Sequence, residues 1–256
     1  MTDAPRVSVI MPARNAECYI AAAIASLWRG GVEDIEVLVV DDGSTDATAR
    51  IVDDIAAREP RLRRMSLPPS GVSRARNAGI AAARAPCLTF LDADDLCAPD
   101  RIGRQLDCLE RQGVRVVLGD LMLFEALDGD WRPRPGTRFN RVTGVSLTTM
   151  LFRREIFDDY GGCDEGLALG EDLDFLLRLM DGGEPIHHDP AIAVYYRRHD
   201  RNTTRLNPDG SKVMLRLLHR SLGRRRAGGQ VGGRADLGKT FLMARQRADA
   251  GFGEGS

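Results

Sequence analysis

The sequence predicts an α/β protein whose central sheet is mostly parallel and flanked by helices. Within the first hundred residues, short runs rich in Val, Ile and Leu alternate with segments whose apolar residues recur every three or four positions. Runs of the first kind predict buried strands, and segments of the second kind predict amphipathic helices. Strands separated by helices of about 10–15 residues imply right-handed crossovers between parallel neighbours.

Each expected element follows from its local pattern. In the first half, strands are expected at 6–11, 35–40, 62–67 and 87–91, and helices at 19–27, 46–57 and 74–83. The next part is less regular, with strands expected at 114–124, 147–152 and 192–196, helices at 154–159 and from 171, and a loop rich in Gly, Pro and Arg at 128–141. From about residue 207 the chain is expected to be helical and basic.

Charge is distributed unevenly along the chain. The formal net charge of -1 argues against nucleic acid or another polyanion as a partner of the whole molecule. Between residues 197 and 247, however, 14 Arg or Lys stand against three Asp. This basic third predicts contact with anionic acceptors or lipid head groups through Arg216, Arg220 and 224–226, or else only a solvated helix face.

The five cysteines indicate the compartment. They are scattered, with neither the pattern of a disulfide framework nor zinc-ligand spacing, which is typical of reduced thiols in a cytoplasm. No apolar run approaches the roughly 18 residues needed to span a bilayer. Residues 1–5 lead directly into a strand-like segment, so no leader peptide is expected. We therefore expect a cytoplasmic protein whose basic third lies at the inner face of the membrane.

Carboxylates gather where two expected strands end. Asp41 and Asp42 follow the strand at 35–40, and the strand at 87–91 runs into LDADD, with carboxylates at 92, 94 and 95. Taken singly, each group is more often a turn and helix cap than a site. Because ligands bind beyond the carboxyl ends of parallel strands, two acidic groups at one sheet edge favour a site.

The clustered carboxylates suggest a nearby cation, which would be a metal ion or an arginine. The alternative is that water alone solvates them. Like charges raise one another's pKa values, and an opposite charge offsets this effect. Glu171 and Asp172 add carboxylates at a helix start, and His199 follows two arginines at a strand end. Oxygen ligands with few nitrogens suit Mg²⁺ or Mn²⁺, which commonly hold substrate phosphates, so a nucleoside diphosphate is an expected ligand.

Five segments in order resemble the signatures of family 2 glycosyltransferases with the GT-A fold. They read VSVIMPARN at 7–15, EVLVVDDGSTD at 36–46, GVSRARNAG at 71–79, FLDADD at 90–95 and GED at 170–172. The resemblance runs from about Val7 to His199. It implies a GT-A domain at 1–205, with a nucleotide-binding half at 1–100 and an acceptor-binding half at 101–205. A helical, Arg-rich extension at 206–256 would follow.

The resemblance implies donor-site roles position by position. A carboxylate of Asp41, Asp42 or both would accept the ring N–H of uracil or another base, and Asp92 would contact the ribose. Many family members have an aromatic residue after the first proline of the motif, whereas this chain has Ala13, so no stacking on the base is expected there. The resemblance also assigns donor binding to the turn of Pro12, Ala13, Arg14 and Asn15, and to Gly71, Arg76 and Ala93.

The resemblance assigns the ion and the chemistry to other side chains. Asp94, with or without Asp95, would bind the Mn²⁺ or Mg²⁺ that bridges the diphosphate, and His199 would reach the same ion or the diphosphate. Such a cation neutralises charge on the departing diphosphate. Asp172 would be the general base that takes the proton of an acceptor hydroxyl as it attacks the anomeric carbon, with inversion.

The implied substrates are a nucleotide-sugar donor, with UDP as the expected nucleotide, and a saccharide or lipid-linked acceptor. No Q-x-x-R-W motif follows Asp172, and the sequence contains no membrane-spanning run. Both absences favour the addition of one sugar per encounter over processive polymer synthesis.

Other functions stay open at this point. GRADLGKT at 233–240 matches the phosphate-binding loop of NTPases, but no buried strand precedes it. A nucleotidyltransferase would carry a Gly-rich basic loop after the first strand, where this chain reads PARN. A catalytically silent module that binds sugar nucleotides or polysaccharides would be expected to lack Asp94 or Asp172. Asp172 could also serve only as a helix cap.

Overall fold

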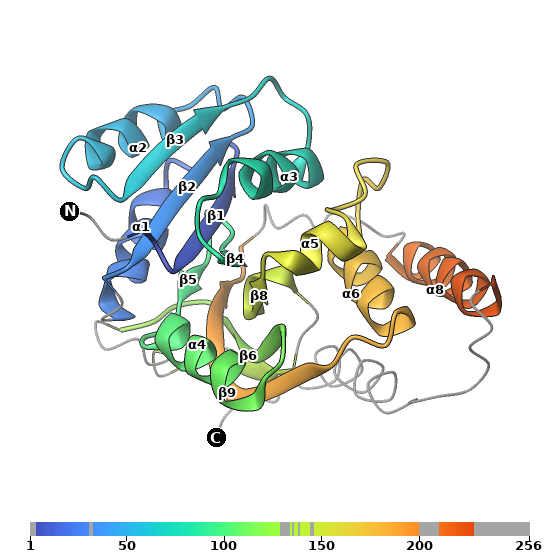
Figure 1. Ribbon diagram of the computed structural model, residues 1–256. Helices are drawn as coiled ribbons and strands as arrows, with labels where there is room; N and C mark the ends of the chain where they lie inside the picture. Colours follow the sequence, from blue (N-terminus) through green and yellow to red (C-terminus); the bar gives the residue numbers. More distant parts are fainter. Residues whose placement is uncertain are drawn as a thin grey trace.

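The computed structural model describes residues 4–30, 33–128, 134, 136–137, 139–143, 146–199 and 210–227. The strands of these residues form one sheet (Figure 1). Its order is β3 (Leu62–Ser66), β2 (Ile35–Asp41), β1 (Val7–Ala13), β4 (Cys87–Phe90), β8 (Met150–Arg153), β6 (Val116–Phe124), β9 (Ile186–Arg197) and β5 (Leu96–Cys97), with β7 (Phe139–Val142) paired to β6.

The first half of the sheet is the parallel unit that the sequence predicts. β3, β2, β1 and β4 are parallel neighbours. They are connected by α1 (Ile20–Leu27) with the short η1 (Trp28–Gly30), α2 (Thr48–Ala56) and α3 (Val72–Ala82). One boundary differs in a way that matters for the site. β1 continues to Ala13, so Pro12 and Ala13 are buried strand residues, and the turn begins only at Arg14.

The second half of the sheet is mixed. β8 lies antiparallel between β4 and β6, whereas β9 runs parallel to β6 and antiparallel to β5. The short η2 (Leu147–Thr149) leads into β8. The helices of this half are α4 (Arg101–Gln112), α5 (Glu155–Tyr160) and α6 (Glu171–Asp181).

Several expected bounds are wrong in this half, because tertiary contacts override the local pattern. β9 begins at Ile186 rather than 192, since an ion pair to Arg104 and a hydrogen bond to Asp120 hold the polar side chains of Asp189 and His188. β7 lies in the segment expected to be a loop, where it pairs with residues 121–124 of β6. The strand expected at 147–152 starts as η2, because the Ser146 side chain caps this turn.

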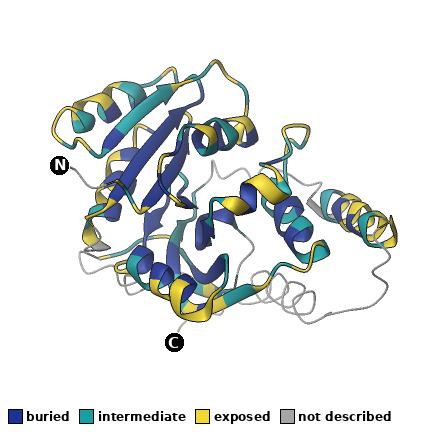
Figure 2. Ribbon diagram, viewed as in Figure 1, coloured by how far each residue is buried: buried dark blue, intermediate teal, exposed yellow. Residues whose placement is uncertain are grey.

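Alternation along β1 divides the core between the two faces of the sheet. Val7, Val9 and Met11 pack with residues of α1, α2 and α4, whereas Ile10 packs with residues of α3, α5 and α6. Figure 2 shows the buried strands between these helices, whose outer surfaces are exposed. α3 lies so close to β1 that a Cβ at Gly79 would approach Ile10 Cγ2 to 2.3 Å. This close packing holds α3 against this face of the sheet.

The helix α8 (Gly210–Ala227) packs against α6 (Figure 1). The domain boundary expected near residue 205 and the NTPase-like pattern at 233–240 lie outside the described residues. No helix in the described part of the chain combines the length and the apolar composition that crossing a bilayer requires.

Candidate active site

The ends of β1 and β2 form one wall of the site. Asn15, at a positive φ of 51°, donates its backbone N–H to Ser44 Oγ at 3.0 Å. Its side-chain oxygen accepts the backbone N–H of Thr45 at 2.8 Å. The turn after β1, which includes Arg14, and the DDGSTD segment after β2 are therefore one bonded unit, as expected for residues that share a sheet edge.

Asp41 and Asp42 are both buried, and each shapes the backbone around it. Asp42 accepts hydrogen bonds from the N–H and hydroxyl of Ser70 at 2.7 and 2.8 Å, and from the N–H of Gly71 at 2.9 Å. Gly71 precedes α3 at a φ of +94°, a conformation that favours glycine. Asp42 thus fixes the entry to α3. Asp41 accepts the N–H of Ser44 at 3.0 Å.

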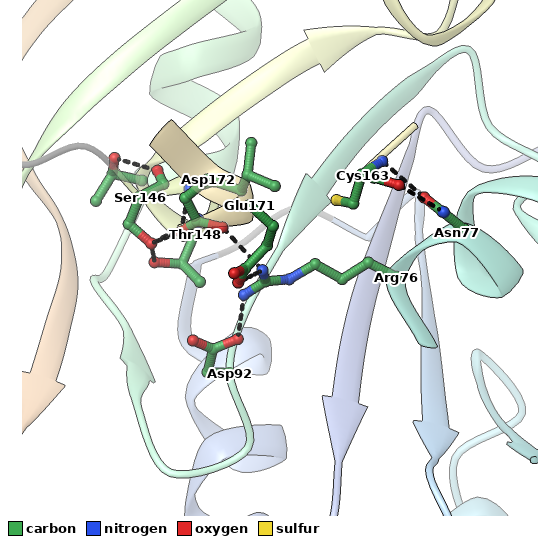
Figure 3. Close-up of polar contacts among 10 residues, drawn as sticks. Arg76, Asn77, Asp92, Ser146, Thr148, Cys163, Glu171 and Asp172 are labelled. Carbon is green, nitrogen blue, oxygen red and sulfur yellow. Dashed lines mark hydrogen bonds and ion pairs between the residues drawn. The ribbon is translucent and has the colours of Figure 1, made fainter. Parts of the chain in front are cut away.

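Arg76 of α3 joins three of the acidic side chains predicted for the site (Figure 3). Its Nη1 donates to Glu171 Oε1 at 2.7 Å and to Asp172 Oδ1 at 2.8 Å, and its Nη2 donates to Asp92 Oδ1 at 3.0 Å. Only 3% of the Arg76 side chain is exposed. Burial alone would lower the pKa of Arg76, but Asp172, Asp92 and Glu171 raise it well above its ordinary value. An arginine is therefore one cation among the clustered carboxylates.

We call Arg76, Asp92, Glu171 and Asp172 the Arg76 cluster. It holds three carboxylates against one guanidinium, so the negative charge is only partly offset. Desolvation raises the pKa of Asp92 to about 6 even though Arg76 lowers it. Burial, and then Asp172, likewise raise the pKa of Glu171. These directions indicate a site that favours a proton or an additional cation.

Asp172 is held by both of its oxygens. Oδ1 accepts Arg76, whereas Oδ2 accepts the Ser146 hydroxyl at 2.9 Å and the Leu147 backbone N–H at 3.1 Å (Figure 3). The contacts on Oδ2 come from the start of η2, and those on Oδ1 come from α3. The carboxylate at the beginning of α6 is therefore fixed by elements from both halves of the sequence.

The remaining carboxylates of the LDADD segment face β9. Asp94 Oδ2 lies 2.9 Å from His199 Nε2. Asp95 is completely buried and accepts the backbone N–H of Arg197 at 2.9 Å. Burial, and then Asp94 and Asp92, raise the pKa of Asp95 well above its ordinary value. Ala93, between these aspartates, is buried. Asp95 thus attaches the segment to β9, and Asp94 lies beside the histidine.

Asp94 and His199 carry donor atoms of the kinds that bind a divalent ion. Among the residues that the structure describes, no group of three or more His, Cys, Asp or Glu side chains is arranged to hold a metal. The pair offers one carboxylate oxygen and one imidazole nitrogen, and both side chains are partly exposed. Mg²⁺ typically takes one or two carboxylates and completes its shell with water and phosphate oxygens.

Sequence reasoning missed three residues around these groups. The ring of Tyr19 stacks on His199, with centroids 4.9 Å apart and an interplanar angle of 20°. Arg197 packs over Tyr19 and donates from Nε to the Asp94 carbonyl at 3.0 Å. Ser146 binds Asp172. A usable signal existed for Tyr19, which occupies the N-cap of α1, a position where Ser, Thr, Asp or Asn is usual.

Comparison with known proteins identifies the family. The family model described as "Glycosyl transferase family 2" matches residues 8–163, a region that contains the segments at 36–46, 71–79 and 90–95. The chain belongs to this family. This match confirms the family resemblance inferred from the motifs. The matched region ends before Glu171, Asp172 and His199, so it does not include these residues.

Two relatives illustrate the family membership. The uncharacterized glycosyltransferase EpsJ of Bacillus subtilis is 30% identical over 220 residues, which covers 79% of this chain and 64% of that protein. The succinoglycan biosynthesis protein ExoO of Rhizobium meliloti is 30% identical over 223 residues, covering 79% of this chain and 63% of that protein. The chain therefore spans somewhat less than two thirds of the length of these relatives.

A solved structure confirms the fold expected for this family 2 chain. The crystal structure of S. aureus TarS 1-349 in complex with UDP-GlcNAc matches with a TM-score of 0.68 at 20% identity. The match covers 86% of this chain and 66% of that one. The mostly parallel sheet flanked by helices is thus of the expected GT-A type.

Proposed function

We propose that this family 2 protein transfers one sugar from a UDP-sugar to a hydroxyl group of a saccharide or lipid-linked acceptor, with inversion. The observation that carries the proposal is the Arg76 cluster, in which Asp92 and Asp172 are bound to one guanidinium. The donor class is supported by the TarS structures, which contain UDP and UDP-GlcNAc. The acceptor class is supported by ExoO, a succinoglycan biosynthesis protein.

The donor would lie across the carboxyl ends of β1, β2 and β4. Asp41 and the turn of Arg14 and Asn15 would contact the base, and Asp92 would bind the ribose. Mn²⁺ or Mg²⁺ held by Asp94 and His199 would supply a positive charge that stabilises the departing diphosphate.

Asp172 would accept the proton of the acceptor hydroxyl. A carboxylate offers about four lone-pair positions, and Arg76, Ser146 and Leu147 occupy three of them here. The position left is on Oδ1, which accepts only one of these three bonds. The acceptor oxygen forms a bond to the anomeric carbon as the bond from that carbon to the diphosphate oxygen breaks. The electron pair leaves with UDP, and the proton goes to Asp172.

A donor screen tests this proposal. Binding stabilises a protein by RT ln(1 + [L]/Kd), so UDP and the preferred UDP-sugar should raise the unfolding midpoint, and more strongly with Mn²⁺ present. Saccharide acceptors are then added, and NMR of the product reports the anomeric configuration. The absence of any shift with nucleoside diphosphates would contradict the proposal. Binding without any sugar transfer would instead identify a silent binding module.

A further inference from the structure

The helix α8 has two faces of different character. The inner face packs on α6, where Leu217 is 1% exposed and a Cβ at Gly170 would approach both Leu217 Cδ1 and Val213 Cγ1 to 2.9 Å. Gly170 directly precedes Glu171 and Asp172, and its φ of +86° favours glycine. The inner face of α8 therefore packs directly on the start of the helix that carries Asp172.

Most arginines near the end of α8 are used to hold it in place. Arg224 and Arg225 each donate from Nε to Asp181 at 2.7 Å, and the Ser221 hydroxyl does so at the same distance. Arg220 pairs with Asp164 at 2.9 Å. Three of the arginines expected from the sequence to meet anionic groups are thus bound to the protein's own carboxylates.

The outer face of α8 combines exposed leucines with basic residues. Leu215, Leu218 and Leu222 follow the spacing of one helical stripe and are 68%, 37% and 51% exposed. Arg216 and Arg226 are also exposed. Gly210–Ala227 contains no acidic residue. A helix with an apolar stripe beside basic side chains can lie in the plane of a membrane interface and bind anionic lipids.

We propose that the outer face of α8 docks on an anionic lipid surface. The leucine stripe would enter the boundary between head groups and acyl chains, while Arg216 and Arg226 would contact lipid phosphates. A second copy of this chain fits the face less well, because a symmetric contact would bring two basic helices together.

Docking in this way has a consequence for the substrate, which rests on the proposed function. Since α8 packs on Gly170, a bound protein holds Asp172 on the side of the molecule nearest the bilayer. Figure 1 shows α8 beside α6, at the opposite end of the molecule from α2 and β3. An acceptor carried on a lipid would therefore enter the site from the side nearest the bilayer.

Sedimentation with vesicles tests the docking surface without any sugar substrate. The whole chain should pellet with vesicles of phosphatidylcholine and phosphatidylglycerol, and less with phosphatidylcholine alone. Replacing Leu215, Leu218 and Leu222 together by Ser should lower the vesicle partition coefficient roughly tenfold or more. Arg216→Gln with Arg226→Gln should lower it by roughly tenfold on the anionic vesicles only.

Matched controls separate this surface from general effects. Phe139→Ser removes an apolar side chain that is 56% exposed on β7 and should leave vesicle binding unchanged. Circular dichroism checks that every variant is folded. Two results would overturn the proposal: wild type that stays in solution with anionic vesicles, or leucine variants that bind as wild type does. A change of oligomeric state in the leucine variants, without vesicle binding by wild type, would assign the face to self-association. Neither result bears on donor binding, so the proposed function is judged separately.

Discussion

Two groups of acidic and basic side chains, most of them half-buried, lie at opposite ends of α6, and they differ in charge balance. At its start, the Arg76 cluster sets three carboxylates against one guanidinium. Near its end, the single carboxylate of Asp181 accepts hydrogen bonds from Ser221, Arg224 and Arg225. The pKa values of Asp92 and Glu171 are raised, whereas that of Asp181 is lowered.

This contrast distinguishes the proposed reaction centre from a structural contact. A cluster with surplus negative charge is completed by a proton, a cation or a substrate, so its residues can act on a ligand. A carboxylate with a lowered pKa is already satisfied by its neighbours and stabilises the fold. The imbalance, more than burial, therefore points to the Arg76 cluster as the site of chemistry.

Removing the Arg76 guanidinium should have the largest effect on stability and on sugar transfer. Arg76→Ala leaves Asp92, Glu171 and Asp172 without their shared partner, and breaking a buried ion pair costs about 3–5 kcal/mol. We expect a loss of roughly that size in the free energy of unfolding, measured by chemical denaturation, and transfer reduced at least about 100-fold. Arg74→Ala, an exposed arginine of the same helix, should change neither quantity. Wild-type transfer by Arg76→Ala would contradict the assignment.

The pH dependence of stability should have opposite signs at the two ends of α6. Burial raises the pKa of Asp181, but hydrogen bonds from Ser221, Arg225 and Arg224 outweigh it, so the pKa is lowered on folding. Ionised Asp181 then stabilises the fold above its unfolded pKa of about 3.9, and this contribution is lost as pH falls through the lower folded value. The stability of wild type relative to Asp181→Asn should therefore decrease below about pH 4.

Glu171 should behave in the reverse way. Its folded pKa is raised by burial and Asp172, so the folded state keeps the proton longer than the unfolded state does. Stability relative to Glu171→Gln should thus decrease as pH rises above the unfolded pKa of about 4.3. Denaturation series between pH 3 and 7 measure both slopes, and slopes of equal sign would remove the distinction between the two groups.

A smaller effect is expected where Tyr19 stacks on His199. Aromatic pairs contribute about 0.5–1.5 kcal/mol beyond their buried area, so losing the stack should weaken Mn²⁺-dependent UDP binding roughly two- to tenfold. Calorimetry should show this loss for Tyr19→Ala, whereas Tyr19→Phe keeps the ring and should bind as wild type does. Equal affinities for both variants would show that the stack does not position His199.

The parallel half of the fold was predictable from sequence because its signals are local. Apolar runs such as 35–40 and helical stripes such as 19–27 reappear with small shifts in their ends. The mixed half was less predictable, because the polar start of β9 depends on contacts of His188 and Asp189 with residues distant in sequence.

The candidate site shows the same limit. The acidic residues could be singled out by their positions at strand and helix ends. Their shared contact with Arg76 could not, because it requires α3, β4 and α6 to meet in space. The motif resemblance named Arg76 as a donor-binding residue, whereas its described contacts are with the carboxylates.

The same conservative substitution at both ends of α6 tests the central claim most directly. UDP release from the preferred UDP-sugar and acceptor is measured for Asp172→Asn and Asp181→Asn, together with the unfolding midpoint of each. Asp172→Asn should lose about 10²–10⁴-fold in rate with a smaller loss of stability than Arg76→Ala, because Glu171 and Asp92 still pair with Arg76. Asp181→Asn should keep the rate per folded molecule and unfold at a lower temperature. Equal turnover by Asp172→Asn and wild type would contradict the account.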